Sequence, residues 1–235
     1  MQRDFDHLII RPIAHIRTDF SGKFGIPRQA SVVRGLVGRI VFEKEFRKDG
    51  ILRGMDGFSH MILIWGFSKE KEDKWSSMIR PPKLGGNEKV GVFASRSPNR
   101  PNPLGFSVVE IEQIVEGKDG PEILVRGADM VDGTPIYDIK PYLSYSDSYP
   151  DASTGYAVPP EEIHLNVIIP DELLACIDKE DEQSLKELLA QDPRPGYRKE
   201  GTFFFEFRHY HIGFEVRNDT LNVVCLTDLK KQKVS

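Results

Sequence analysis

Residues 80–105 read R-P-P-K-L-G-G-N-E-K-V-G-V-F-A-S-R-S-P-N-R-P-N-P-L-G, and their prolines and glycines exclude regular helix from most of the stretch. Only residues 89–95, short and apolar, are predicted to form a strand. The flanking loops carry basic side chains against one acid, Glu88: Arg80, Lys83, Lys89, Arg96 and Arg100. Rigid basic loops suit an anionic ligand. On composition alone, an ordinary loop with solvated charges is as well supported as a ligand-binding loop.

The chain has 235 residues, a length that fits one large domain or two unequal ones. No apolar run approaches the roughly 20 residues that cross a bilayer, and the N-terminus lacks the apolar segment of a signal peptide. Two cysteines, Cys176 and Cys225, give no disulfide framework and fit a reducing compartment. We expect a soluble cytoplasmic protein that does not enter membranes.

The formal net charge of -4 argues weakly against indiscriminate binding to nucleic acid. A local basic surface remains compatible with this value, because salt screens charges beyond about 8 Å. Residues 80–100 are the one stretch where bases clearly outnumber acids. If the protein binds RNA, this stretch is the predicted contact.

Up to about residue 145, short apolar segments alternate with Gly/Pro turns, and none has ten residues of helical period. The expected strands cover residues 7–17, 31–46, 58–67, 105–116 and 122–131, with an extended stretch at 132–143 and a helical turn within 47–56. Many short strands imply an antiparallel sandwich or barrel. We favour a barrel, since closure removes exposed edges.

Composition changes after residue 144. Residues 144–160 are predicted to be a linker, 170–191 helical, and residues around 202–210, 211–215 and 221–226 strands. We therefore expect a mainly β protein, with an N-terminal antiparallel β-barrel domain at 1–158 and a small C-terminal α+β domain at 159–235. A domain of that size gains from docking or dimerising.

Several common catalytic patterns are missing from the sequence. No Ser or Cys stands in a recognisable triad or elbow, and no G-x-G-x-x-G opens a helix. The pair His209-x-His211 is interpreted as structural rather than as a metal site, and no metal is expected.

Five phrases are specific when taken together: P-R-Q (27–29), F-S-H (58–60), R-P-P-K-L-G-G-N (80–87), G-V-F-A-S-R-S-P-N-R-P-N-P-L-G (91–105) and D-M-V-D-G-T-P-I-Y-D-I-K-P-Y (129–142). With them the chain resembles the TrmO (YaeB-like) family of tRNA methyltransferases. Residues 188–197, L-L-A-Q-D-P-R-P-G-Y, resemble the extra domain of its bacterial members. The resemblance implies a homodimeric β-barrel enzyme that uses S-adenosylmethionine. Its implied acceptor is N6 of threonylcarbamoyl-adenosine at tRNA position 37, beside the anticodon.

The resemblance also implies which residues bind the cofactor. One wall is expected from Pro27, Arg28, Gln29, His60, Met61, Arg96 and Leu104, and the opposite wall from Asp129, Met130, Val131 and Asp132. Arg28 or Arg96 is the candidate partner of the donor's carboxylate. Taken alone, His60 would be a core histidine, but the F-S-H match favours binding.

Asp138 or Asp132 is predicted to accept the N6 proton. Each has a structural alternative, because Asp132-Gly133 suits a turn and Asp138 can pair with Lys140. Contacts with tRNA are expected from Arg80, Lys83, Arg100, Asn102, Lys140 and Tyr142.

Two other functions compete with this one. The first is a non-catalytic RNA-binding barrel with a C-terminal dimerisation module, which stoichiometric cofactor binding would exclude. The second is methylation of a small molecule by the same cofactor, which selectivity for modified tRNA would exclude.

Overall fold

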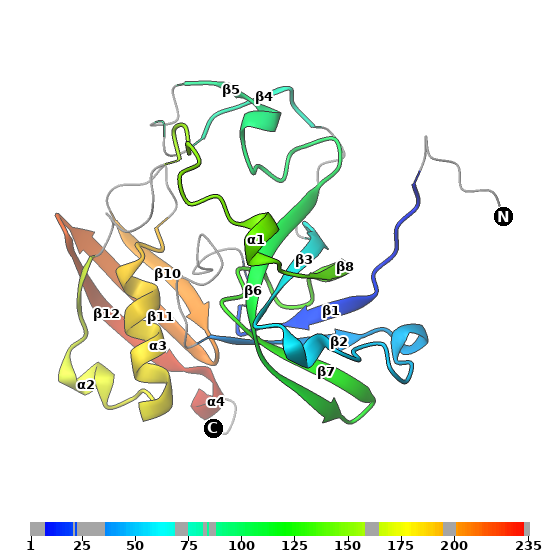
Figure 1. Ribbon diagram of the computed structural model, residues 1–235. Helices are drawn as coiled ribbons and strands as arrows, with labels where there is room; N and C mark the ends of the chain where they lie inside the picture. The colour runs from blue at the N-terminus through cyan, green and yellow to red at the C-terminus, as the bar shows by residue number, and fades with distance from the viewer. Residues whose placement is uncertain are drawn as a thin grey trace.

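The computed structural model describes residues 8–20, 22, 36–68, 75–81, 84, 88–157, 165–194 and 201–232. Within them the protein consists of two large β-structures joined by extended segments, with few helices (Figure 1). The prediction of a mainly β protein is therefore confirmed. No helix of these residues is long and apolar enough to cross a membrane.

The first structure contains six strands, which hydrogen-bond in the order β1-β2-β7-β6-β3-β8, all antiparallel. Strand β8 also pairs with β1, so that the sheet closes into a barrel. The strands are β1 (Ala14–Arg17), β2 (Val37–Phe42), β3 (His60–Gly66), β6 (Leu104–Gly117), β7 (Gly120–Arg126) and β8 (Pro135–Pro141).

Strand β3 lies centrally, as its apolar sequence predicts, and pairs with both β6 and β8. Its side chains alternate between the two faces of the sheet. Met61, Leu63 and Trp65 are buried in the barrel core, whereas His60, Ile62 and Ile64 lie on the outer face and are only partly buried. This alternation decides on which side of the wall each candidate residue lies.

The strand predicted at residues 89–95 is wrong for most of its length. Only β5 (Val90–Gly91) is extended, paired with β4 (Met78–Ile79), and η4 (Val92–Ala94) is a 3-10 turn. The chain turns because Val92 is buried and its carbonyl accepts bonds from both the N–H and the hydroxyl of Ser95. Two further 3-10 turns are η1 (Lys44–Phe46) and η2 (Met55–Gly57).

The C-terminal part has a four-stranded sheet in the order β10-β11-β12-β9, in which β9 runs parallel to β12. The strands are β9 (Asn166–Ile168), β10 (Thr202–Phe207), β11 (Tyr210–Arg217) and β12 (Thr220–Asp228). The sequence did not predict β9, and the turn between β10 and β11 lies at residues 208–209, earlier than predicted.

Helices are predicted at residues 170–191 and are found there as α2 (Asp171–Leu174) and α3 (Lys179–Ala190). Helix α3 buries Leu185, Leu188 and Leu189 in the core of this sheet. The remaining helices are single turns, α1 (Ser144–Asp147) in the predicted linker and α4 (Leu229–Gln232) after β12.

Each sheet has its own hydrophobic core. The C-terminal core also includes Phe20 and Leu36, two residues from the N-terminal part of the chain that are 1% and 4% exposed. The two structures are therefore joined by buried apolar contacts as well as by the chain. The division at residue 158 stays a prediction.

Inside the barrel, Trp65 lies directly opposite Gly105 of β6. A Cβ atom added to Gly105 would overlap the indole ring, so the glycine makes room for it. Phe67 packs edge-on against the indole, with the ring centroids 4.5 Å apart. Trp65 thus contacts both the backbone of β6 and a second ring.

We predict that Gly105→Ala destabilises the barrel, because the added methyl group forces the buried indole out of its position. The expected loss of unfolding free energy is about 1–3 kcal/mol, measured by denaturant titration. Gly91→Ala is the matched control, since nothing lies within 4 Å of a Cβ atom there. Equal effects of the two substitutions would contradict this packing.

Candidate functional site

The structure describes most of the predicted site residues. Pro27, Arg28, Gln29 and Lys83 lie outside the described residues. Met61 is buried in the barrel core. The others fall into three groups: the 129–132 loop between β7 and β8, the outer face of β3 and β8, and the basic loops of residues 75–81 and 92–104.

The first acid of the 129–132 loop is held by a chain of hydrogen bonds from inside the barrel. The indole N–H of Trp65 donates to the hydroxyl of Ser107 at 3.0 Å, and this hydroxyl donates to a carboxylate oxygen of Asp129 at 2.7 Å. Ser107 is 3% exposed and Trp65 is 9% exposed. The two hydrogen bonds fix the direction in which the Asp129 carboxylate points.

The last acid of the loop, Asp132, is held from the other side by residues that follow β1. Its carboxylate accepts the backbone N–H of Thr18 at 3.1 Å and lies 3.5 Å from the Arg17 guanidinium. Its own N–H donates to the carbonyl of Phe20 at 2.8 Å, and the Thr18 hydroxyl donates to the carbonyl of Met130 at 3.0 Å. Asp132 thus holds the segment that follows β1, as well as closing a turn.

Asp138, the other candidate proton acceptor, forms the ion pair that its spacing from Lys140 allows. One carboxylate oxygen lies 2.9 Å from the Lys140 ammonium, and the other accepts the N–H of Ile139 at 3.0 Å. The side chain is 48% exposed and therefore open to solvent and ligands. The pair does not exclude a catalytic role, because the carboxylate stays accessible beside the ammonium.

His60 and Tyr142 lie near each other at the end of β3 and β8. The N–H of Tyr142 donates to the His60 carbonyl at 3.1 Å, and the two ring centroids are 6.1 Å apart. Ser59 contacts Nδ1 of His60 at 2.9 Å. His60 projects outward, whereas Ser107, which binds Asp129, points into the barrel. Within a single subunit, His60 and the anchor of Asp129 therefore lie on opposite faces of the barrel sheet.

The loop of residues 92–104 is braced by its own polar groups. Arg100 donates from its guanidinium to the carbonyl of Ser95 at 3.1 Å, and the Ser95 and Ser97 hydroxyls accept N–H groups two residues on. Tyr156, in the linker after α1, donates to the carbonyl of Ala94 at 2.8 Å. These braces join groups whose pairing the sequence does not predict.

Several side chains of the basic loops remain exposed. Arg80, Arg96 and Asn102 are exposed, and Phe93 is 77% exposed. Arg100 is half-buried because it braces its own loop. Exposed guanidinium groups provide charge for phosphates, and an exposed ring provides a surface for stacking.

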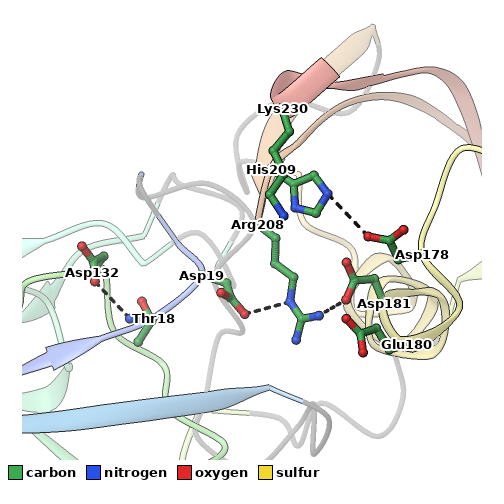
Figure 2. A pocket seen from close by; sticks show the side chains of 9 residues that line it. All are labelled: Thr18, Asp19, Asp132, Asp178, Glu180, Asp181, Arg208, His209 and Lys230. Atoms are coloured by element: carbon green, nitrogen blue, oxygen red, sulfur yellow. Dashed lines mark hydrogen bonds and ion pairs between the residues drawn. The ribbon is translucent and has the colours of Figure 1, made fainter. Parts of the chain in front are cut away.

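An open pocket lies between the barrel and the C-terminal sheet, and Figure 2 shows its lining. Asp178, Asp181 and His209 offer ligand atoms that lie within 4.8 Å of one another there, a spacing that a metal ion would tolerate. Arg208 forms an ion pair with Asp181 at the same place and so already supplies positive charge. His211, in contrast, stacks on Phe204, with the ring centroids 5.5 Å apart.

Two groups beside this pocket have shifted pKa values. Burial raises the pKa of the Tyr210 hydroxyl, and the N–H that Asp178 donates to it opposes the shift. Desolvation raises the pKa of Asp228, but the N–H of Lys230 and the charges of His209 and Lys231 outweigh it and lower the pKa below its ordinary value.

Comparison with known proteins gives the same family by sequence and by structure. The family model described as the tRNA-methyltransferase O N-terminal domain matches residues 15–148. The chain is 40% identical over 193 residues to the tRNA (adenine(37)-N6)-methyltransferase of Escherichia coli strain K12, covering 80% of this chain and 82% of that protein.

Another tRNA (adenine(37)-N6)-methyltransferase, from Eikenella corrodens, is 45% identical over 143 residues, covering 60% of this chain and 80% of that protein. The crystal structure of TrmO from Pseudomonas aeruginosa superposes with a TM-score of 0.72 at 27% identity, covering 94% of this chain and 99% of that one. The likeness therefore extends over the barrel and the C-terminal part.

We predict that Ser107→Ala destabilises the protein, because the buried N–H of Trp65 loses its acceptor. The expected loss is about 1–3 kcal/mol of unfolding free energy. The double variant Trp65→Phe/Ser107→Ala removes donor and acceptor together, so its loss should be smaller than the sum of the two single losses. Strict additivity in denaturant titrations would argue against the bond.

Proposed function

The chain belongs to the tRNA-methyltransferase O family of S-adenosylmethionine-dependent tRNA (adenine-N6)-methyltransferases, and we propose that its acceptor is N6 of threonylcarbamoyl-adenosine at tRNA position 37. The family, the activity and the cofactor predicted from the sequence are thereby confirmed. The match over residues 15–148 carries the proposal, since it includes the 129–132 loop, strand β8 and both basic loops.

The donor set of the described residues fits S-adenosylmethionine, which supplies the methyl group. Asp129 presents a carboxylate whose orientation is fixed by Ser107, and such a group suits ribose hydroxyls or an amino group. Arg96 is exposed and suits the carboxylate of the amino-acid moiety. Leu104 is exposed and can supply apolar surface, whereas Met130 is buried in the barrel core.

Methyl transfer requires alignment of donor and acceptor and removal of one proton. Asp138 is the better placed acceptor for the proton, because its carboxylate is accessible and the ion pair and hydrogen bond that it forms are with neighbours in its own strand. The Asp132 carboxylate is occupied by the N–H of Thr18 and by Arg17, so we assign it to holding the loop.

The tRNA side of the site is proposed at the basic loops and the outer face of β8. Arg80, Arg100 and Asn102 are candidates for phosphate and sugar contacts, and Tyr142 for stacking on a base. Lys140 can balance the carboxylate of the threonyl group. The brace from Tyr156 holds the 92–104 loop in place before RNA binds, which reduces the entropy lost on binding.

The homodimer is proposed from the outer face of the barrel. Leu104 and Phe106 are 37% and 54% exposed, and the outward positions Ile62, Ile64 and Val108 adjoin them on the paired strands β3 and β6. Contiguous apolar surface of this kind marks protein–protein contacts. The proposed location is the cytoplasm, where tRNA is modified.

Separate cores support the proposed division into a barrel methyltransferase domain, residues 1–158, and an α+β domain, residues 159–235.

The acceptor can be tested with two forms of one tRNA. Labelled S-adenosylmethionine should transfer its methyl group to threonine tRNA purified with its threonylcarbamoyl group, and not to the same tRNA transcribed without it. Equal labelling would mean that the group is not recognised. Absence of label from both, with the cofactor still bound, would overturn the proposed acceptor.

The role of Asp138 can be tested by replacing its carboxylate. An amide in place of its carboxylate cannot accept the proton, so Asp138→Asn should lower turnover by about 10²–10⁴-fold while leaving cofactor affinity unchanged. Asp119→Asn, which removes a 63% exposed carboxylate at the β6–β7 turn, is the control and should be inert. Loss of affinity with normal turnover would place Asp138 in the cofactor wall instead.

A further inference from the structure

The segment Thr18–Phe20, called here the 18–20 segment, runs between the barrel and the C-terminal sheet (Figure 2). Toward the barrel it binds the 129–132 loop through three hydrogen bonds. The N–H and hydroxyl of Thr18 donate to the Asp132 carboxylate and the Met130 carbonyl, at 3.1 and 3.0 Å. The carbonyl of Phe20 accepts the N–H of Asp132 at 2.8 Å.

Toward the C-terminal sheet, the same segment is held by an apolar and by a charged contact. The side chain of Phe20 is 1% exposed and belongs to the C-terminal core. The Arg208 side chain contacts the Asp19 carboxylate at 3.0 Å, and the Arg208 N–H donates to the Asp19 carbonyl at 3.3 Å. The 18–20 segment is thus bound both to the barrel and to the C-terminal sheet.

Arg208 has an unusual backbone for its residue type. It occupies the turn between β10 and β11 with a φ of 54°, in the left-handed region that favours glycine. From this position its guanidinium lies between Asp19 and Asp181 (Figure 2). The Asp181 side chain is 2% exposed, and an ion this deeply buried needs a partner. The ion pairs of the Arg208 side chain offset the energetic cost of its left-handed backbone conformation.

We propose that the C-terminal domain positions the 129–132 loop of the barrel through the 18–20 segment, with Asp19 and Arg208 as positioning residues. The C-terminal core and Arg208 hold the segment, and the segment in turn supplies three of the hydrogen bonds that order the loop. An ordered loop presents Asp129 and Asp132 in one arrangement, so less freedom is lost when a ligand binds. The consequence for S-adenosylmethionine rests on the proposed function, but the coupling itself does not.

The loop also has bonds that do not depend on the C-terminal domain. Ser107 holds Asp129 from inside the barrel, and the N–H of Gly133 donates to the Ile16 carbonyl at 2.8 Å. Loss of the coupling should therefore loosen the end of the loop at Asp132 and leave the Asp129 end in place.

The test compares Asp19→Ala and Arg208→Ala with Arg217→Ala in the full chain. Arg217 is the matched control, because its guanidinium is 82% exposed and pairs with Glu215 in its own strand. Amide hydrogen exchange of the peptide that contains residues 129–134 is measured without ligand, and S-adenosylmethionine affinity is measured by calorimetry. Asp19→Ala is the milder variant, since it leaves Asp181 paired with Arg208.

We expect the Asp132 amide to exchange about tenfold faster in Asp19→Ala and in Arg208→Ala, and the dissociation constant to rise by a similar factor, as for loss of one hydrogen bond to a charged group. Arg217→Ala should match the wild type in both. The β6 and β7 amides should be unchanged in all three variants.

Unchanged exchange at Asp132 in Asp19→Ala would overturn the coupling, because the barrel alone would then hold the loop. Faster exchange with unchanged affinity would also overturn the positioning role. If the wild-type chain itself binds no S-adenosylmethionine, the proposed function fails, whereas the exchange data still decide whether the two domains are coupled.

Discussion

The burial of Trp65 is the constraint on which the interior of the candidate site depends. A ring of this size fits opposite β6 only because residue 105 is a glycine. Its buried N–H needs an acceptor, which Ser107 provides. A serine hydroxyl that accepts one bond keeps its own proton to donate, and it donates to the carboxylate of Asp129. The orientation of a candidate ligand-binding acid thus follows from the packing of a core tryptophan.

The other end of the same loop is fixed by a different core. Asp132 is bound by Thr18 and Phe20, and Phe20 is buried among the side chains of the C-terminal sheet. A short loop attached at each end to a separate hydrophobic core has few conformations open to it. In such a loop, backbone and carboxylate groups are positioned before a ligand arrives, which is the arrangement that favours binding and alignment.

The sequence predicted those features that depend on local pattern. The apolar run around Leu63 identified β3, alternation identified β6, and the leucines of α3 identified a helix. Prediction failed where tertiary contacts decide the local structure. Residues 92–94 form a turn because Val92 is buried there, and β9 is three residues long and pairs with a strand over 50 residues away.

The site was predicted in the same uneven way. Motif resemblance made Asp129 and Asp132 candidates, and its place in an extended run made Asp138 one. The spacing of Asp138 and Lys140 allowed the observed pair. The partners that orient these groups could not be read from the sequence. Ser107 is separated from Asp129 by 22 residues, Thr18 from Asp132 by 114, and Arg208 from Asp19 by 189. Only the register of the barrel and the docking of the C-terminal sheet bring them together.

The wall of the barrel separates two sets of candidate residues. Asp129 is bound on the inner side, through Ser107, whereas His60, Asp138 and Lys140 project from the outer side of β3 and β8. Methyl transfer requires reacting atoms about 3–3.5 Å apart, so both sets can serve one reaction only if their surfaces meet. The apolar outer face around Phe106 provides the surface on which a second copy would rest. In the proposed dimer, the second subunit therefore packs beside the candidate residues of the outer face.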